Sequence, residues 1–300
     1  MRPPFSPSQS HMGYFLVVLS AFTFATKSIL AKMSYNYGVD AITVLTIRMI
    51  FAGLIFAGIL AYKLSFRQWK LDFTAGQWGA IVALGIFGYY LSALFDFSGL
   101  MYVDASLGRM ILFLYPTLVV LINAAISRSH ISGSTWLALG LCYGGIFMMM
   151  LPNIGGGQSN LWLGSGLIFT SALLYASYMV SIDRLLRNLD AIRLTSLIMV
   201  VSSISVIIHF SVTNDFKSLL SVAAPVYING ALMGLFSTVL PIYALAAGVA
   251  RVGASRAALI SMMGPVLTLL MGVLLLDEHL TIIQLAGMFL VMAGVSRVGK

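Results

Sequence analysis

Four ionisable residues lie inside strongly apolar stretches of this 300-residue sequence: Lys27, Arg48, Asp96 and Arg109. A charge at bilayer depth is costly unless it is paired or reaches water, so each of these residues is a functional-site hypothesis. Arginine can hold a carboxylate or phosphate through two parallel hydrogen bonds, whereas lysine acts as a point charge. A buried aspartate with a raised pKa can carry a proton. The four residues could therefore hold an anionic group or move a proton.

The composition indicates a membrane protein. The chain is 60% hydrophobic and 9% charged, with a mean hydropathy of +0.98, whereas soluble domains carry about 25% charged residues. The net charge of +8 does not indicate a nucleic-acid partner, because the basic residues stand singly between apolar runs. The single Cys142 excludes an intrachain disulfide, and the four histidines lack metal-ligand spacing. We expect no metal and no cofactor.

Ten apolar segments predict ten transmembrane helices. Residues 1–12 are polar and rich in Pro and Ser, and we expect a disordered cytoplasmic tail there. Most of the later segments reach the roughly 20 residues that span a bilayer core. The predicted spans are 13–33, 41–62, 77–99, 103–126, 134–151, 161–181, 192–213, 226–249, 253–276 and 281–298. The predicted fold class is an all-α polytopic membrane protein.

The basic residues predict the orientation of the chain. With the N-terminus in the cytoplasm, twelve of the 17 lysines and arginines fall in inner regions. The outer loops then hold two, Lys32 and Lys217, and the remaining three lie inside spans. Positive residues accumulate on the cytoplasmic side of membrane proteins. We expect a multi-pass protein of a bacterial-type inner (plasma) membrane with both termini cytoplasmic.

The sequence also contains an internal repeat. Residues 96–116 align without a gap with residues 245–265, and the glycines, an Ala-Ser pair and a proline recur while the charges do not. In the same way SAFTFAT, from Ser20, matches SALLYAS, from Ser171. Five spans in each half force the second half to enter the membrane from the opposite side. We predict two inverted repeats, 13–151 (the first half) and 161–298 (the second half), an architecture associated with alternating access to a site between them.

Three stretches resemble the EamA-type, ten-helix members of the drug/metabolite transporter superfamily. They are SAFTFATKSILAK in the first span, LTIRMIFAG around Arg48, and the late run VGASRAALISMMGPVLTLLMGVLLLDEHLTIIQLAGMFLVMAGV. The resemblance implies two EamA-like repeats and a secondary active transporter, with export as its direction. One departure stands out. The first-half turn, 127–132, reads SRSHIS where the second half has the acidic DEHLT.

The four buried charges are expected at a common depth. A rise of about 1.5 Å per residue places all four in the outer half of the membrane, roughly 5–11 Å below its outer boundary. Asp96 could pair with Arg109 or with Lys27, and one such pair leaves two cations uncompensated. Because an uncompensated buried charge is unfavourable, an anionic ligand group would stabilise them.

Aromatic and polar residues supply candidates for the rest of the site. Ser171, Tyr175 and Tyr178 share one helical face in the second half. The candidate substrate-binding residues are Lys27, Arg48, Tyr89, Ser92, Asp96, Arg109, Phe113, Tyr175, Tyr178, Tyr243 and Met262. The candidate hinges are the span prolines Pro116, Pro241 and Pro265.

The predicted function is secondary active transport of small organic metabolites, with amino acids or other organic carboxylates as the favoured solutes. An exchanger of phosphorylated or nucleotide-linked sugars, an exporter of cationic or lipophilic drugs, and a channel-like protein stay as alternatives. The sequence holds no set of residues typical of an enzyme. The expected partners are a small-molecule substrate, a coupling proton or counter-substrate, and the lipid bilayer. A monomer and a homodimer both remain open.

Overall fold

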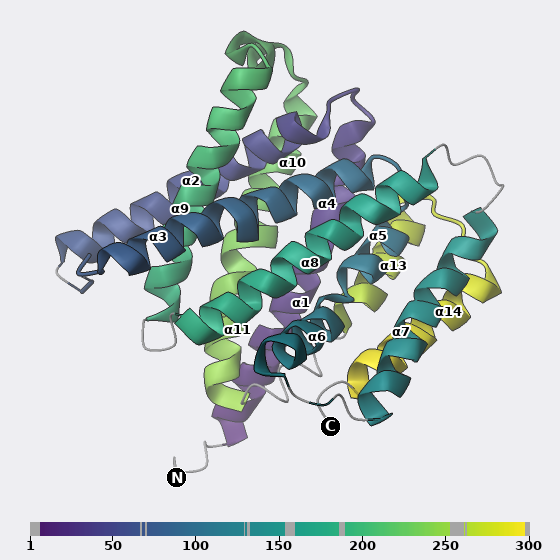
Figure 1. Ribbon diagram of the computed structural model, residues 1–300. Helices are drawn as coiled ribbons and strands as arrows, with labels where there is room; N and C mark the ends of the chain where they lie inside the picture. Colours follow the sequence, from purple (N-terminus) through teal and green to yellow (C-terminus); the bar gives the residue numbers. More distant parts are fainter. Residues whose placement is uncertain are drawn as a thin grey trace.

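The computed structural model describes residues 7–297 except 67, 70, 129, 131–132, 154–159, 186–189, 253–260 and 262. These residues form helices and no strands (Figure 1), as predicted for an all-α polytopic membrane protein. Helices are expected in lipid because every backbone N–H must find its acceptor within the segment. The first-half helices are α1 Pro7–Tyr35, α2 Ala41–Ser65, α3 Ala75–Ala83, η1 Leu84–Leu91, α4 Ser92–Leu100, α5 Ala105–Leu112, α6 Tyr115–Ser127, α7 Gly133–Met150 and η2 Leu151–Asn153.

The second half repeats this order. Its helices are α8 Leu161–Leu185, α9 Ala191–Thr213, η3 Phe216–Ser221, α10 Ala224–Gly234, η4 Leu235–Val239, α11 Leu240–Val252, α13 Met263–Leu276 and α14 Ile282–Arg297. Among the described residues, eight helical stretches are long and apolar enough to span a membrane, and α13 and α14 are shorter apolar helices. The early part of the predicted ninth span, 253–260 and 262, lies outside the described residues.

The starting points of three helices have identifiable causes, and one of them differs from the prediction. Helix α1 begins at Pro7, inside the segment predicted to be a disordered tail, and proline is favoured in the first turn of a helix. Asp40 and Asp190, each followed by Ala-Ile in the sequence, are N-caps of α2 and α9. Their carboxylates accept hydrogen bonds from the backbone N–H groups of Thr43 at 3.0 Å and Arg193 at 2.7 Å. Such caps satisfy N–H groups that have no partner within the helix.

Three of the predicted spans are not uniform α-helices. The fourth is divided at Phe113 and Leu114, and Pro116 lies in the first turn of the helix that follows. The third and eighth contain π-helical segments, η1 and η4, at corresponding positions of the two halves. Pro241 is the second residue after η4, in the first turn of α11. Single π-helical segments are frequent at functional sites, and the apolar pattern gave no sign of them.

Repeated glycines bring the first and third spans of opposite halves into backbone contact. A Cβ on Gly99 would lie 2.4 Å from the Ile168 Cγ1 atom and 2.7 Å from the Gly164 carbonyl oxygen. At the corresponding place, a Cβ on Gly248 would lie 2.6 Å from a Val17 methyl group and 3.2 Å from the Gly13 carbonyl oxygen. These reciprocal contacts join α4 to α8 and α11 to α1.

The second and fifth spans also pair across the halves. A Cβ on Gly53 in α2 would lie 2.6 Å from the Ser203 hydroxyl oxygen in α9. Between α7 and α14, a Cβ on Gly145 would lie 2.5 Å from the Gly287 carbonyl oxygen, and the reverse contact has the same length. The two halves are therefore interleaved along four helix pairs.

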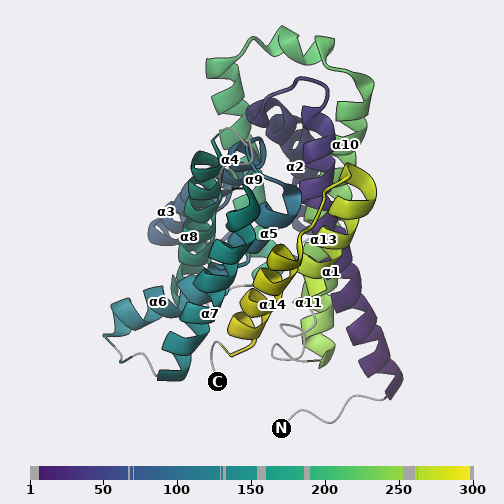
Figure 2. The ribbon, with the colours of Figure 1, turned by 90° about the vertical axis from the view of Figure 1, so that its right-hand side faces the viewer.

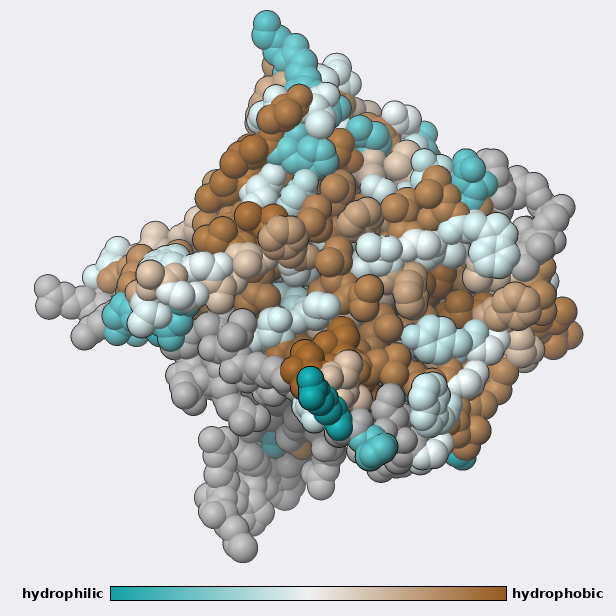
Figure 3. Space-filling view, in the orientation of Figure 1, coloured by the Kyte–Doolittle hydropathy of each residue, from teal (hydrophilic) through white to brown (hydrophobic). Residues whose placement is uncertain are grey.

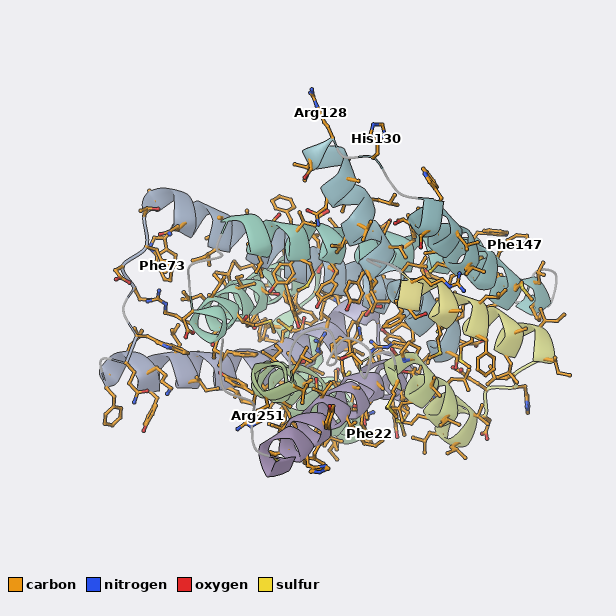
Figure 4. The ribbon with its side chains drawn as sticks, turned by 90° about the horizontal axis from the view of Figure 1, so that it is seen from below. Phe22, Phe73, Arg128, His130, Phe147 and Arg251 are labelled. Carbon is orange, nitrogen blue, oxygen red and sulfur yellow. The ribbon has the colours of Figure 1, made fainter. Side chains whose placement is uncertain are left out.

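The outer surface and the termini fit a bundle embedded in lipid. Brown apolar side chains dominate the middle of the face in Figure 3, and most of the hydrophilic ones lie toward the projecting ends. Seen from below, the exposed rings of Phe22 and Phe147 lie on the outside of the bundle (Figure 4). The beginning of α1 and the end of α14 lie at the same end of the bundle, opposite the connection between α9 and α10 (Figure 2).

The substitution Gly99→Ala should lower the thermal unfolding midpoint of the detergent-purified protein. Its methyl group would collide with a backbone carbonyl, and overpacking of this kind typically costs about 1–3 kcal/mol. Gly140→Ala is the matched control, because its Cβ would meet nothing within 4 Å among the described atoms. Equal midpoints for the two variants would contradict the close contact between α4 and α8.

Candidate functional site

Lys27 and Asp96 form a buried ion pair between α1 and α4. The Lys27 Nζ atom lies 2.5 Å from the Asp96 Oδ2 atom, and the two residues are 5% and 3% exposed. Of the two partners that the sequence left open for Asp96, the structure selects Lys27. This pair is a positive and a negative group that satisfy each other inside the bundle.

Arg48 connects α2 to the π-helical segment of the second half. Its Nε atom donates a hydrogen bond to the Thr238 Oγ1 atom at 3.0 Å. The Thr238 hydroxyl in turn donates to the Met233 carbonyl at 2.9 Å. The guanidinium carbon of Arg48 lies 5.3 Å from the centre of the Phe97 ring, and Tyr89 lies beside the same guanidinium. Arg48 therefore links the first half to the second through its hydrogen bond to Thr238.

Arg109 lacks such a set of contacts. The residue is 7% exposed, and its Nε atom is buried without a hydrogen-bond partner among the described residues. The guanidinium carbon lies 4.6 Å from the centre of the Phe24 ring, on which the Lys27 ammonium also lies, at 5.4 Å. A Cβ on Gly264 of α13 would come within 3.0 Å of the Arg109 Nη2 atom. Arg109 thus presents an unsatisfied donor between α1, α5 and α13.

A chain of tyrosine rings begins next to Arg109 and crosses between the halves. The centres of the Tyr115 and Tyr175 rings lie 5.1 Å apart, and both residues interact electrostatically with Arg109. Tyr175 stacks on Tyr178 at 5.8 Å, and Tyr178 meets the edge of Tyr89 at 6.1 Å. The predicted face of Tyr175 and Tyr178 is therefore close to Arg109 and at the contact between the halves.

The remaining candidates occupy different places. The Ser92 hydroxyl donates to the Ser171 carbonyl at 3.0 Å, so Ser92 contributes to the α4–α8 contact. The Phe113 ring lies 6.3 Å from Tyr115, at the break between α5 and α6. Tyr243 stacks on Phe56 of α2 at 6.4 Å. Met262 lies outside the described residues.

The buried charges do not balance. Within the described part of the chain, the charged residues that are buried are three cations and one acid, namely Lys27, Arg48, Arg109 and Asp96. Arg48 and Arg109 both act electrostatically on Lys27. Because interactions between charges strengthen in a low-dielectric interior, the excess positive charge favours an anionic group at this place.

Sequence reasoning missed several side chains that shape the site. Phe24 precedes Lys27 by three residues, so helical spacing could have placed both on one face. Tyr115 lies beside the candidate hinge Pro116 and could have been included with it. The Thr238 partner of Arg48 could not have been found, because the two residues are 190 positions apart and no pattern within one helix connects them.

Comparison with known proteins identifies the family. The model of the EamA-like transporter family matches residues 11–151 and again residues 162–298. This chain therefore belongs to the EamA-like transporter family, and it is a multi-pass membrane transporter.

Similar proteins occur in bacteria and archaea. The uncharacterized transporter YcbK of Bacillus subtilis (strain 168) is 31% identical over 293 residues, covering 94% of this chain and 92% of its own length. An uncharacterized transporter of Archaeoglobus fulgidus is 27% identical, covering 89% of this chain and 92% of its own length. A solved crystal structure superposes with a TM-score of 0.64 at 16% identity, over 97% of each chain, and supports the fold.

Removing one member of the Lys27–Asp96 pair should destabilise the protein more than removing both. Asp96→Leu leaves the Lys27 charge buried and unpaired, which typically costs about 3–5 kcal/mol. The double variant Lys27→Met, Asp96→Leu should recover most of this loss. Thermal unfolding of the wild type and the two variants in detergent checks the prediction. A double variant less stable than Asp96→Leu would show that the pair is not the main partner of either charge.

Proposed function

We propose that this transporter exports small organic carboxylates, amino acids among them, by alternating access between its two halves in a bacterial-type inner membrane. The observation that carries the proposal is the buried Arg109 Nε atom, which has no hydrogen-bond partner among the described residues. A guanidinium can bind a carboxylate through two parallel charge-assisted hydrogen bonds. Phe24, beneath the guanidinium, would hold its plane in place.

The surroundings of Arg109 suit a solute with an apolar or aromatic part. Tyr115 and Tyr175 lie beside it, and the stacked Tyr178 continues the aromatic chain. A carboxylate on Arg109 would place the rest of the solute against these rings. The rings come from both halves, so the solute would contact each half, as alternating access requires.

The alternative candidate solutes, phosphorylated sugars and cationic drugs, match the buried charges less well. A phosphate carries close to two negative charges at neutral pH, whereas Lys27 is engaged by Asp96 and Arg48 by Thr238. A cationic drug needs a buried acid. Asp96 is the buried acid of the described residues, and Lys27 already neutralises it. One carboxylate, bound mainly by Arg109, is the ligand that best matches the arrangement.

The class of solute can be found by thermal shift. Amino acids, other organic acids, sugar phosphates and organic cations are each added to the detergent-purified protein, since a ligand that binds the folded state raises its unfolding midpoint. We expect the carboxylates to stabilise the wild type and to have no effect on Arg109→Ala. Stabilisation by sugar phosphates or by cations alone would overturn the carboxylate proposal.

The substitution Arg109→Ala should also slow transport strongly. Exchange of the radiolabelled carboxylate selected by the screen, measured in proteoliposomes, should fall roughly a hundredfold, as expected for the loss of a charge-assisted contact. Arg297→Ala is the matched control, because it removes the same charge from an exposed position at the end of α14. Wild-type exchange by the Arg109 variant would exclude this residue from the site.

A further inference from the structure

Glu278 binds the beginning of the helix that carries Arg109. It lies in the turn between α13 and α14, and its Oε1 atom accepts a hydrogen bond from the Ala105 backbone N–H at 2.6 Å. Its Oε2 atom accepts from the Ser106 backbone N–H at 3.3 Å and from the Ser106 hydroxyl. A carboxylate of the second half therefore caps α5 of the first half.

This carboxylate replaces the cap that the chain would ordinarily supply itself. Asp104 occupies the N-cap position of α5, yet its side chain makes no capping hydrogen bond to the described backbone of that helix. Asp40 and Asp190, in contrast, cap their own helices directly. The N-terminal N–H groups of a helix need an acceptor, and for α5 the acceptor comes from 173 residues away.

The backbone conformation of the turn after α13 directs the Glu278 side chain toward the beginning of α5. Asp277 has a left-handed backbone with φ of +53°, and the Glu278 backbone N–H donates to the Gly272 carbonyl at 3.1 Å. The carboxylate lies against Gly272, where a Cβ would come within 2.6 Å of the Glu278 Oε2 atom. The left-handed residue and the glycine together bring the acid onto α5.

One face of α13 carries both the Glu278 contact and the Arg109 contact. Gly264, Thr268 and Gly272 are spaced four residues apart, so they lie on the same side of the helix. A Cβ on Gly272 would lie 3.0 Å from the Ser106 hydroxyl oxygen, and a Cβ on Gly264 would lie 3.0 Å from the Arg109 Nη2 atom. Thr268, between them, is 0% exposed.

We propose that Glu278 is a positioning residue. It acts as a latch that joins α5 to α13 near the beginning of α14 (Figure 2) and so holds Arg109 against the second half. The latch must open before α5 and α13 can separate at that end. The role of this opening in transport rests on the proposed alternating access, but the latch itself can be tested without any solute.

The first half has no matching acid. The residue aligned with Asp277 is Arg128, which is also left-handed with φ of +49°. The residue aligned with Glu278 is Ser129, whose side chain carries no charge. The latch is therefore a feature of one copy of the repeat, and opening at the two ends of the bundle would be controlled by different groups.

Protonation should weaken the latch. Burial, reinforced by Asp104, raises the pKa of the Glu278 carboxyl above its ordinary value, although the hydrogen bonds from Ser106 and Ala105 oppose the shift. The charged groups that face it are Asp104 and Lys32 of α1, with Asp277 and His279 beside it in the turn. A protonated carboxyl loses charge and acceptor capacity, so the latch is strongest above this pKa and weakens as the pH falls through it.

A cysteine introduced in place of Thr268 reports on the latch. Thr268→Cys is made in a Cys142→Ala background, and its reaction with a maleimide is timed in detergent with and without Glu278→Gln. We expect Glu278→Gln to accelerate labelling roughly ten- to a hundredfold, the factor for loss of a hydrogen bond to a charged group. Ser106→Ala, which removes one of the three donors, should give a smaller acceleration.

Two controls separate the latch from general loss of stability. Asp277→Asn removes a neighbouring charge while keeping a residue that tolerates the left-handed backbone, and it should leave labelling unchanged. The native Cys142, which is 0% exposed between α7 and α14, reports on global opening in the chain that retains Thr268. Its labelling should not respond to Glu278→Gln.

The pH profile completes the test. The ratio of the labelling rates with and without Glu278→Gln is taken at each pH, so that ionisation of the cysteine cancels. This ratio should approach one as the pH falls through the Glu278 pKa. The latch is overturned if the thiol of the Thr268→Cys variant labels equally fast in both proteins, if Cys142 labelling accelerates in parallel, or if the ratio does not change with pH.

Discussion

An excess of positive charge in a low-dielectric interior is the constraint on which the rest of this structure depends. Among the described residues, three buried cations face one buried acid, and a buried charge is stable only when other groups compensate it. The protein compensates Lys27 with Asp96 and Arg48 with Thr238. Arg109 interacts electrostatically with the same Asp96 carboxylate, but its contacts are an aromatic ring and a close glycine, and its Nε atom has no hydrogen-bond partner among the described residues. The uneven compensation singles out one of four similar candidates.

The packing between the halves is of two physical kinds. The pairs α1–α11, α4–α8 and α7–α14 meet at glycines, where backbones approach too closely for any side chain to intervene. Such contacts hold helices firmly in register, because a shift would produce clashes. The α5–α13 contact is different, since it depends on polar side chains, Glu278 with Ser106 and Arg109 over Gly264. Side-chain hydrogen bonds can be exchanged for hydrogen bonds to water or a ligand at a net cost of about 0.5–3 kcal/mol each, so this is the contact best suited to change.

Repetition and function are divided between different residues. The glycines that recur in both halves form reciprocal helix contacts, and the recurring aspartates cap helices. The groups with unusual surroundings, Arg109 and Glu278, have no charged counterpart at the aligned positions 258 and 129. Each of these groups therefore occurs in one half only, Arg109 in the first and Glu278 in the second, so the two ends of the bundle need not respond alike to pH or to a solute.

The sequence by itself determined the fold class, the approximate helix boundaries and the four residues whose charge is buried. These follow from local hydropathy and segment length, which act within a single helix. The tertiary structure decided that Asp96 pairs with Lys27, 69 residues away, and that Glu278 caps a helix 173 residues away. It also decided the break at Phe113 and the π-helical segments. Such features depend on how neighbouring helices are rotated and shifted against each other, and periodicity within one helix carries no information about that register.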